Sequence, residues 1–259
     1  MGGLFYNLGR QLGRRAVPAI RKSGWIWKSL AGSEDEARRA ERALGEALAV
    51  EVRAAAELAD DPETSALVND ICQRLEQRLR PPHHPFHCGL LRAGEPNAMA
   101  LPGGFIFLST SLVDLCERKP DELAFVVGHE MAHVVRGHAW DRMIQQTGLQ
   151  ALSAVASRGG PMGAWLRQQG MQVFVSAHSR DGELEADELG ARLAATAGFS
   201  AAGPLSLLHR LERFGSDAAA LGRYFASHPP ARDRIASLTP LCRKLAGGSG
   251  QTGESMSKP

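Results

Sequence analysis

The sequence His129-Glu130-Met131-Ala132-His133 decides what this chain can be. It lies in an apolar segment that opens with Pro120, which favours a helix start, so we predict a helix from there to about Gly137. Histidines at positions i and i+4 lie on one helical face, about one turn apart, where both imidazoles can bind one Zn²⁺. Glu130 is turned away from the metal and is placed to take a proton from the attacking water. The motif predicts a catalytic zinc site on a buried helix.

A catalytic zinc site needs a third protein ligand and one open position. The metzincin solution, a third histidine further along the same segment, is excluded because His138 is out of register. The segment 179–187 provides Glu183 and, one helical turn later on the same face, Asp187. Glu183 is the candidate ligand, and Asp187 would orient a ligand histidine through its other ring nitrogen. On spacing alone Glu185 is a rival ligand, and an ordinary acidic helix face is the alternative.

Signals on both sides of the motif predict an α+β fold that is mostly helical, with a small β-sheet over the active-site cleft. Residues 81–110 alternate prolines and glycines with short apolar runs, which predicts two or three strands, among them 86–91 and 105–108. Capping residues, helix-starting prolines and helix-ending glycines predict the helices. These are expected at 34–58, 61–79, 120–137, 181–197 and after Pro204, with a broken helix pair in 147–177.

Composition excludes several classes of protein. The 259 residues are 44% hydrophobic and 22% charged, which is typical of a globular chain. The 30 basic and 28 acidic residues nearly balance, which argues against nucleic acid as a partner. The four cysteines form no C-x-x-C pair and fit buried thiols in a reducing compartment. With no signal peptide and no run of about 18 apolar residues evident, we expect a cytoplasmic protein, which can be peripheral on the membrane surface. The alternative is an organellar protein, because an Arg-rich, acid-poor start is also typical of a mitochondrial transit peptide.

The two ends of the chain differ from the middle. Residues 1–33 carry arginines, lysines and tryptophans among apolar residues and contain no acidic residue. Such a basic amphipathic arm can contact an anionic membrane surface, and the alternative is an arm that packs on the body of the protein. Residues 246–259 are small and polar and are expected to be disordered. We therefore predict an arm (1–33), a metallopeptidase domain (34–245) and a tail (246–259).

Four ordered segments carry a family resemblance. Between Asn97 and Leu238, the chain resembles the gluzincin zinc metallopeptidases that include HtpX, BepA and the CAAX prenyl protease, and is similar in style to their soluble and mitochondrial quality-control branch. The matching segments are 97–108 (NAMALPGG followed by FIFL), 121–124 leading into Gly128 and the histidine motif, 179–187, and 228–235 (His-Pro-Pro with Arg234 and Ile235).

The resemblance implies roles for individual residues. It makes His129, His133 and Glu183 the ligands of one zinc ion and Glu130 the catalytic acid/base, and so selects Glu183 over Glu185. It places His228 where related proteins have a histidine that approaches the zinc, either to block the open position or to stabilise the oxyanion. Arg180 would pair with a carboxylate near the site.

The segment after Asn97 suggests how a substrate binds. In zincin folds an edge strand lies along the cleft, and an extended substrate adds to it as another strand. We therefore expect Asn97, Gly103, Gly104 and Phe105 to contact the substrate, with the two glycines allowing a close backbone approach. Backbone pairing suits an enzyme that acts on many unfolded segments.

The sequence thus predicts a zinc metalloendopeptidase, an HExxH hydrolase of peptide bonds in unfolded or extended polypeptides. Protein quality control of misfolded or membrane-associated proteins is the expected context. Two alternatives remain. One is a latent, chaperone-like module that holds zinc and cleaves little; the other is a peripheral membrane protein whose functional part is the arm.

Overall fold

A small sheet and the helices on its two faces form the described part of the molecule. The computed structural model describes residues 34–80, 83–138, 179–214, 228 and 230–248. The arm (1–33), the predicted broken helix pair (147–177) and the chain beyond Gly248 lie outside these ranges. The described elements are α2 (Glu34–Ala55), α3 (Pro62–Glu76), β1 (His87–Leu91), β2 (Ala98–Leu101), the 3₁₀ turn η1 (Pro102–Gly104), β3 (Phe105–Ser109), α4 (Thr110–Leu115), α5 (Pro120–Val135), α9 (Arg180–Thr196), α10 (Gly203–Phe214) and α12 (Ala231–Gly248).

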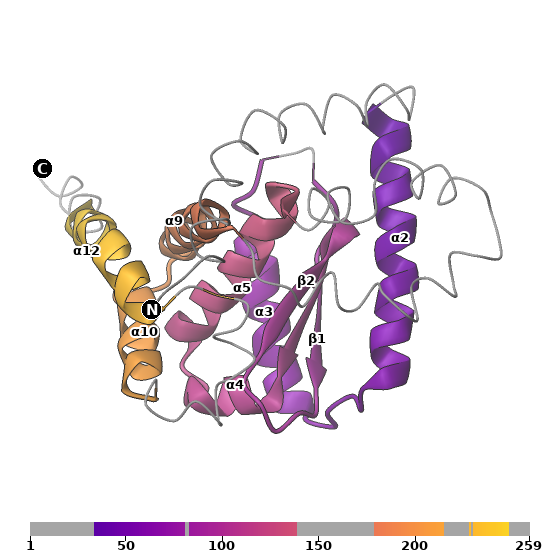
Figure 1. Cartoon of the computed structure of the whole chain (residues 1–259), viewed down its shortest axis with the longest axis horizontal. Coiled ribbons are helices and arrows are strands. Elements are labelled where there is room, and N and C mark those ends of the chain that lie inside the picture. Colours follow the sequence, from indigo (N-terminus) through magenta and orange to yellow (C-terminus); the bar gives the residue numbers. More distant parts are fainter. Residues whose placement is uncertain (1–33, 81–82, 139–178, 215–227, 229, 249–259) are drawn as a thin grey trace, which may run out of the picture.

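The strand order of the sheet is β1-β3-β2, with β1 parallel and β2 antiparallel to the central β3. Helix α2 lies on one side of the sheet, α3 and α5 lie on the other, and α9, α10 and α12 follow beyond α5 (Figure 1). The predicted class, a mostly helical α+β fold with a small sheet, is therefore confirmed.

Every residue of β3 is buried because both faces of the sheet are covered. Ile106 and Leu108 join the main hydrophobic core with α3 and α5. Phe105 and Phe107 alternate with these residues and point to the opposite face of the sheet, as the two-residue period of a strand requires. The guanidinium of Arg42 lies 4.3 Å from the ring centre of Phe105, and that of Arg53 lies 5.7 Å from Phe107. The central strand thus forms the middle layer between α2 and α5.

Two glycines let α5 and α9 approach closely. A Cβ atom added to Gly190 on α9 would lie 2.7 Å from the backbone nitrogen of His129, and one added to Gly128 would lie 3.0 Å from the carbonyl oxygen of Gly190. No side chain fits between the helices at this crossing. The backbone contact therefore holds the acidic residues of α9 against the histidines of α5.

Most predicted helix boundaries agree with the structure to within a few residues. Helix α5 ends at Val135, and Gly137 follows with a φ of 71°, a conformation that favours glycine. Helix α2 ends at Ala55 rather than near Leu58. At the far end, α12 continues to Gly248, so the predicted start of a disordered tail at residue 246 is wrong by three residues. The division into arm, peptidase domain and tail otherwise stays a prediction.

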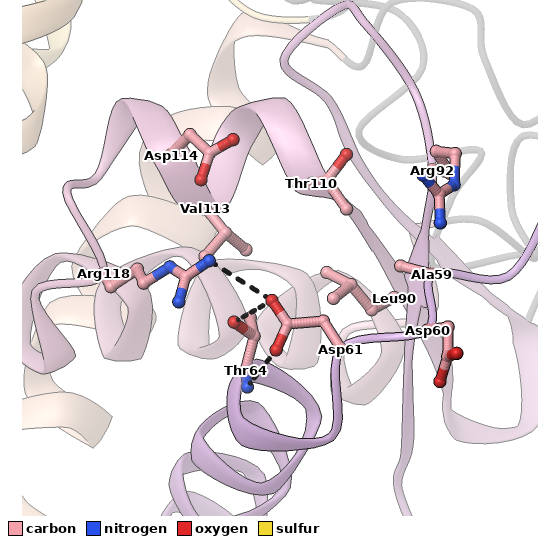
Figure 2. A pocket seen from close by; sticks show the side chains of 10 residues that line it. All are labelled: Ala59, Asp60, Asp61, Thr64, Leu90, Arg92, Thr110, Val113, Asp114 and Arg118. Carbon is pink, nitrogen blue, oxygen red and sulfur yellow. Dashed lines mark hydrogen bonds and ion pairs between the residues drawn. The ribbon is translucent and has the colours of Figure 1, made fainter.

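The start of α3 shows how a local signal fixes an element. Asp61 caps the helix: its carboxylate accepts hydrogen bonds from the backbone nitrogen and the hydroxyl of Thr64, at 3.0 and 2.6 Å (Figure 2). Arg118 donates to the same carboxylate at 3.2 Å. These hydrogen bonds to Thr64, with the nearby charge of Arg118, lower the pKa of Asp61. The pocket of about 250 Å³ around this cap contains none of the predicted site residues.

Candidate metal centre

Three side chains with metal-binding atoms converge at the crossing of α5 and α9. His129 and His133 lie one turn apart on α5, and Glu183 lies in the first turn of α9. The Nε2 atoms of the two histidines are 3.0 Å apart. Glu183 Oε2 is 3.6 Å from His129 Nε2, and Glu183 Oε1 is 3.3 Å from His133 Nε2. All three residues are buried. Two segments separated by about 50 residues in the sequence thus provide one set of candidate ligands.

These separations fit one tetrahedral zinc ion. Bonds of about 2.0–2.1 Å at tetrahedral angles place neighbouring ligand atoms about 3.3 Å apart. The observed distances, measured to Oε2 of Glu183 for His129 and to Oε1 for His133, are 3.0–3.6 Å. Two imidazole nitrogens and one carboxylate also form the donor set typical of catalytic zinc. The residues present therefore fit the metal that the sequence predicted.

A buried ion pair supports His129 from behind. Its Nδ1 atom donates a hydrogen bond to Asp187 Oδ1 at 2.9 Å, and Arg234 on α12 donates to both oxygens of that carboxylate at 2.6 and 2.8 Å. Because Nδ1 carries the proton, Nε2 of the neutral ring has its lone pair directed at the cluster. The predicted contact between Asp187 and a ligand histidine is thus present in the structure.

The charges around Asp187 and His129 shift the pKa values of both side chains. Burial alone would raise the pKa of Asp187, but the Arg234 guanidinium and the hydrogen bonds from Arg234 and His129 outweigh it and hold the pKa at about 2. Burial alone would lower the pKa of His129, and the Asp187 hydrogen bond with the charges of Glu183 and Asp187 raises it instead. Asp187 is therefore a fixed negative charge at neutral pH.

Arg234 is a residue whose role the sequence did not indicate. It belongs to the fourth family segment, but nothing in that segment shows which carboxylate it meets. Its side chain is only 1% exposed, and its partner Asp187 is 47 positions earlier in the chain. An arginine in the first turn of a helix is ordinarily exposed, so sequence reasoning had no signal for this burial.

Glu130 and His228 both lie close to His129. Both are buried, and together with His129 they bring ligand-type atoms within 4.8 Å of one another. The ring nitrogen Nδ1 of His228 is 2.5 Å from Glu183 Oε2, so this histidine contacts the oxygen of a candidate ligand. Its ring centre is 5.2 Å from that of His129. The structure thus brings His228, distant in sequence, to the cluster.

The rival ligand Glu185 lies outside the cluster. Its side chain is 47% exposed, and its carboxylate pairs with Arg136 at 2.9 Å. Arg180, at the start of the same helix, pairs with Asp233 at 2.9 Å, and both side chains are substantially exposed. Arg180 thus pairs with an exposed carboxylate on α12, while the buried arginine of the site is Arg234.

The predicted substrate contacts need correction at three positions. Gly103, Gly104 and Phe105 are all buried. A Cβ atom on Gly103 would lie 2.8 Å from the Cα atom of Arg42, and one on Gly104 would lie 2.4 Å from the carbonyl oxygen of Pro85. The close approach that these glycines allow is therefore to the protein's own chain. Phe105 opens the central strand, whose backbone already pairs with β1 and β2.

Asn97 lies just before β2 and is partly exposed. Its backbone nitrogen donates to the hydroxyl of Ser109 at 2.8 Å. It lines a pocket of about 470 Å³ with Val52, Met99 and Phe107 on the face of the sheet that α2 covers, opposite α5. A contact between Asn97 and substrate stays a prediction.

A second histidine cluster in the sequence does not assemble as a metal site. His84 contacts Glu41 at 3.2 Å, and His87 contacts the guanidinium of Arg42 at 2.9 Å. Within the described ranges, these histidines and Cys88 do not bring three ligand atoms together. Strand β1 begins at His87, within this stretch.

No helix in the described part of the chain is both long and apolar enough to cross a membrane. All four cysteines are free, and three of them are buried. Both observations concern the described residues.

The fold and the cluster define a metal-dependent hydrolase as the class of protein. Two helix histidines, a carboxylate from a second helix and an adjacent glutamate form the arrangement that metallopeptidases use. A family model described as "Peptidase family M48" matches residues 62–241, which is more than half of the chain. The chain therefore belongs to peptidase family M48, a family of metallopeptidases.

Curated relatives support the same assignment. The chain is 27% identical over 207 residues to the "Beta-barrel assembly-enhancing protease" of Escherichia coli (strain K12), an alignment that covers 76% of this chain and 42% of that protein. It is 30% identical over 155 residues to "Metalloprotease LoiP" of the same organism, covering 58% of this chain and 60% of that protein. It is 27% identical over 150 residues to "Mitochondrial metalloendopeptidase OMA1" of Schizosaccharomyces pombe, covering 56% and 43%.

The chain spans less than half the length of the assembly-enhancing proteases that it matches, 37% for that of Yersinia pestis and 42% for that of E. coli.

Proposed function

We propose that this chain is a zinc-dependent endopeptidase that hydrolyses peptide bonds in unfolded or extended polypeptides. The observation that carries the proposal is the convergence of three buried residues: the Nε2 atoms of His129 and His133 are 3.0 Å apart, and each lies 3.3–3.6 Å from an oxygen of the Glu183 carboxylate. His129, His133 and Glu183 are the proposed ligands of one Zn²⁺. Bound zinc would supply Lewis-acid chemistry, polarising the scissile carbonyl and making water a nucleophile at neutral pH.

Glu130 is the proposed general base and acid. It follows a ligand histidine in the chain and is buried beside it, so its carboxylate is held next to the reaction centre. In the first step it accepts a proton from the attacking water as oxygen bonds to the carbonyl carbon. In the second step it returns that proton to the amide nitrogen as the C–N bond breaks. One peptide bond and one water are consumed, and a carboxylate and an amine are formed.

His228 is proposed to block the open position of the metal centre in the resting protein. Its Nδ1 atom contacts Glu183 Oε2 at 2.5 Å, and this contact engages an oxygen of a proposed ligand. We expect the variant His228→Ala to cleave faster than the wild type. A loss of cleavage would instead favour the alternative role, stabilisation of the oxyanion. The two roles predict opposite signs, so one rate comparison decides between them.

Strand β2 is the proposed docking edge for an extended substrate. It pairs with β3 on one side, α5 packs against it, and no other strand lies on its outer side within the described ranges. Backbone groups at that edge can pair with a substrate strand of any sequence. This replaces the predicted use of 103–105, because η1 and β3 lie inside the fold.

A role in protein quality control is the proposed context. One curated relative is named for enhancing β-barrel assembly, which is a process of membrane-protein biogenesis. An enzyme that reads the backbone of extended segments suits the removal of misfolded chains. The alternative is a chaperone-like module that holds zinc and polypeptide with little cleavage. A cleavage assay distinguishes the endopeptidase from this chaperone-like module.

The test is cleavage of reduced casein by the zinc-loaded protein beside Glu130→Gln, with zinc content measured on the same samples. We expect one zinc per chain in both proteins and cleavage by the wild type alone. The glutamine keeps the shape of the side chain but cannot take the proton, so binding of casein should persist. Equal cleavage by both proteins would contradict the role of Glu130. Bound zinc with no cleavage by the wild type or by His228→Ala would favour the chaperone-like module.

The arm is proposed to contact anionic membrane surfaces. Residues 1–33 are basic, apolar and free of acidic residues, a composition that binds anionic lipid through charge and burial of tryptophan. Co-sedimentation with vesicles that contain phosphatidylserine should fall when residues 1–33 are deleted. Unchanged sedimentation would overturn this part of the proposal.

A further inference from the structure

Behind His133, on the side away from the cluster, lies another histidine. Nδ1 of His133 is 2.9 Å from Nδ1 of His138, a hydrogen-bond distance, while Nε2 of His133 faces His129 and Glu183. The two rings are inclined at 66° with their centres 5.1 Å apart. A ligand histidine usually donates its second ring N–H to a carboxylate, a carbonyl or water. Here a second imidazole occupies that position.

The chemistry of neutral imidazole fixes the direction of this hydrogen bond. A neutral ring carries one proton, and Nε2 of His133 must keep its lone pair to bind metal. The proton of His133 is therefore on Nδ1, and Nδ1 of His138 must accept it. This places the proton of His138 on Nε2, which lies 3.7 Å from Glu185 Oε2. The other oxygen of that carboxylate is paired with Arg136 at 2.9 Å.

We propose that His138 is a positioning residue for the metal centre, and that the negative charge of Glu185, 3.7 Å from Nε2 of His138, favours the tautomer in which His138 accepts from His133. The inference rests on the proposed function, because it assigns the support of a proposed zinc ligand. Glu185, which was a rival ligand on spacing alone, then becomes the outermost of three residues in the order His133, His138 and Glu185. We call this series the relay.

The local structure explains why His138 reaches this place. Helix α5 ends at Val135, and Gly137 turns the chain with a φ of 71°. The turn returns His138 to the end of the helix instead of continuing along its axis. On the other side, the first turn of α9 packs against the ring: a Cβ atom on Gly182 would be in ordinary contact with it, 3.5 Å from Cε1 of His138. The ring is thus held between the end of α5 and the start of α9, with 16% of its side chain exposed.

The first test is the zinc affinity of His138→Ala, measured by competition with a chromophoric chelator. Loss of the acceptor should weaken zinc binding by about 10–100-fold, the usual effect of losing an outer partner of a ligand histidine. His138→Asn is the matched rescue, because Oδ1 of asparagine is as many bonds from the backbone as Nδ1 of histidine, and it should restore most of the affinity. His209→Ala, which removes an exposed histidine on α10, is the control and should bind zinc as the wild type does.

The second test reads the tautomer directly. The ¹⁵N chemical shifts of the His133 and His138 rings, recorded for the zinc-loaded protein at pH 8, should show a protonated Nδ1 on His133 and a protonated Nε2 on His138. This measurement uses the wild-type protein, so it does not depend on whether a variant folds. An unprotonated Nδ1 on His133 would overturn the relay.

The outcomes separate this inference from the proposed function. If the wild type binds one zinc and His138→Ala binds it as tightly as His209→Ala does, the relay is wrong and the metal site stands. If the wild type binds no zinc, the proposed function fails and the relay fails with it, because no metal then requires the lone pair on Nε2 of His133.

Discussion

The two proposed zinc ligands on α5 are supported in different ways. His129 donates to Asp187, a carboxylate that is fully buried and held by Arg234, which is 1% exposed. His133 contacts His138, a neutral ring backed by Glu185, whose side chain is 47% exposed. One support is a permanent charge inside the protein, and the other is a neutral acceptor at its surface. A buried ion pair fixes geometry firmly, whereas an exposed pair contributes little free energy and is screened by salt.

The two supports are therefore expected to have different roles in stability and in metal binding. The Asp187–Arg234 pair joins α9 to α12 and orients His129, so it serves both the fold and the site. The His138–Glu185 pair joins the end of α5 to the start of α9 and is partly exposed, so its main effect is expected at the site. Variants of the first should therefore lose stability, and variants of the second should lose metal affinity with little change in stability.

The largest expected effect comes from Arg234→Met. The change leaves the Asp187 carboxylate buried without its charge partner, which should lower the free energy of unfolding of the metal-free protein by about 3–5 kcal/mol. Urea unfolding measures this loss. Arg232→Met, on the exposed side of the same helix, is the matched control and should change little.

A double variant separates stability from metal binding. Replacing both partners, Asp187→Leu with Arg234→Met, removes the buried charges together and should recover most of the lost stability. Zinc affinity should stay low, because His129 no longer has an acceptor. Recovery of both properties would mean that the pair has no part in orienting the histidine.

The next effect in size is expected for Gly190→Ala. The added methyl group would lie 2.7 Å from the backbone nitrogen of His129, so α5 and α9 must separate. Overpacking of this kind costs about 1–3 kcal/mol, and separation of the helices should weaken both histidine supports and zinc binding. Gly247→Ala is the control, since nothing lies within 4 Å of a Cβ atom there. Unchanged zinc affinity in Gly190→Ala would contradict the close crossing.

Stability in acid tests the charge of Asp187. Folding lowers the pKa of this carboxyl from 3.8 to about 2, so its charged form stabilises the fold above pH 3.8. That contribution falls as the pH drops from 3.8 through about 2, where the folded protein takes up the proton. Over this range, the metal-free wild type should therefore lose stability more steeply than Asp187→Asn, which has no proton to take up. Parallel pH profiles from urea unfolding would show that the pKa is not lowered.

The sequence predicted those parts of the site that depend on spacing within one helix. The i, i+4 pairs His129/His133 and Glu183/Asp187 follow from the helical period, and the structure places all four at one crossing. It did not predict the role of Arg234, which depends on which elements meet in space, or that of His138, which depends on how the chain turns at Gly137. The same limit explains the error at 103–105: a strand's sequence does not show whether it lies at the centre or the edge of a sheet. Only the pairing order reveals that β3 is central.

The smallest expected effect concerns the exposed support. Glu185→Ala should weaken zinc binding only about two- to threefold at low ionic strength, because half-exposed charges interact weakly. In 1 M salt, where the screening length is about 3 Å, the difference from the wild type should disappear. Glu188→Ala, which removes an exposed carboxylate paired with Arg192 on the same helix, is the control. A salt-independent loss as large as that of His138→Ala would mean that the outer carboxylate contributes more than its exposure implies.

The central claim is that one zinc ion binds where α5 and α9 cross. The most direct measurement is an anomalous difference map from crystals of the zinc-loaded protein, collected above and below the zinc absorption edge. The account predicts a single peak per chain, at about 2.0–2.1 Å from Nε2 of His129, Nε2 of His133 and an oxygen of Glu183. A peak at the His84–His87 segment instead, or none at the helix crossing, would contradict it.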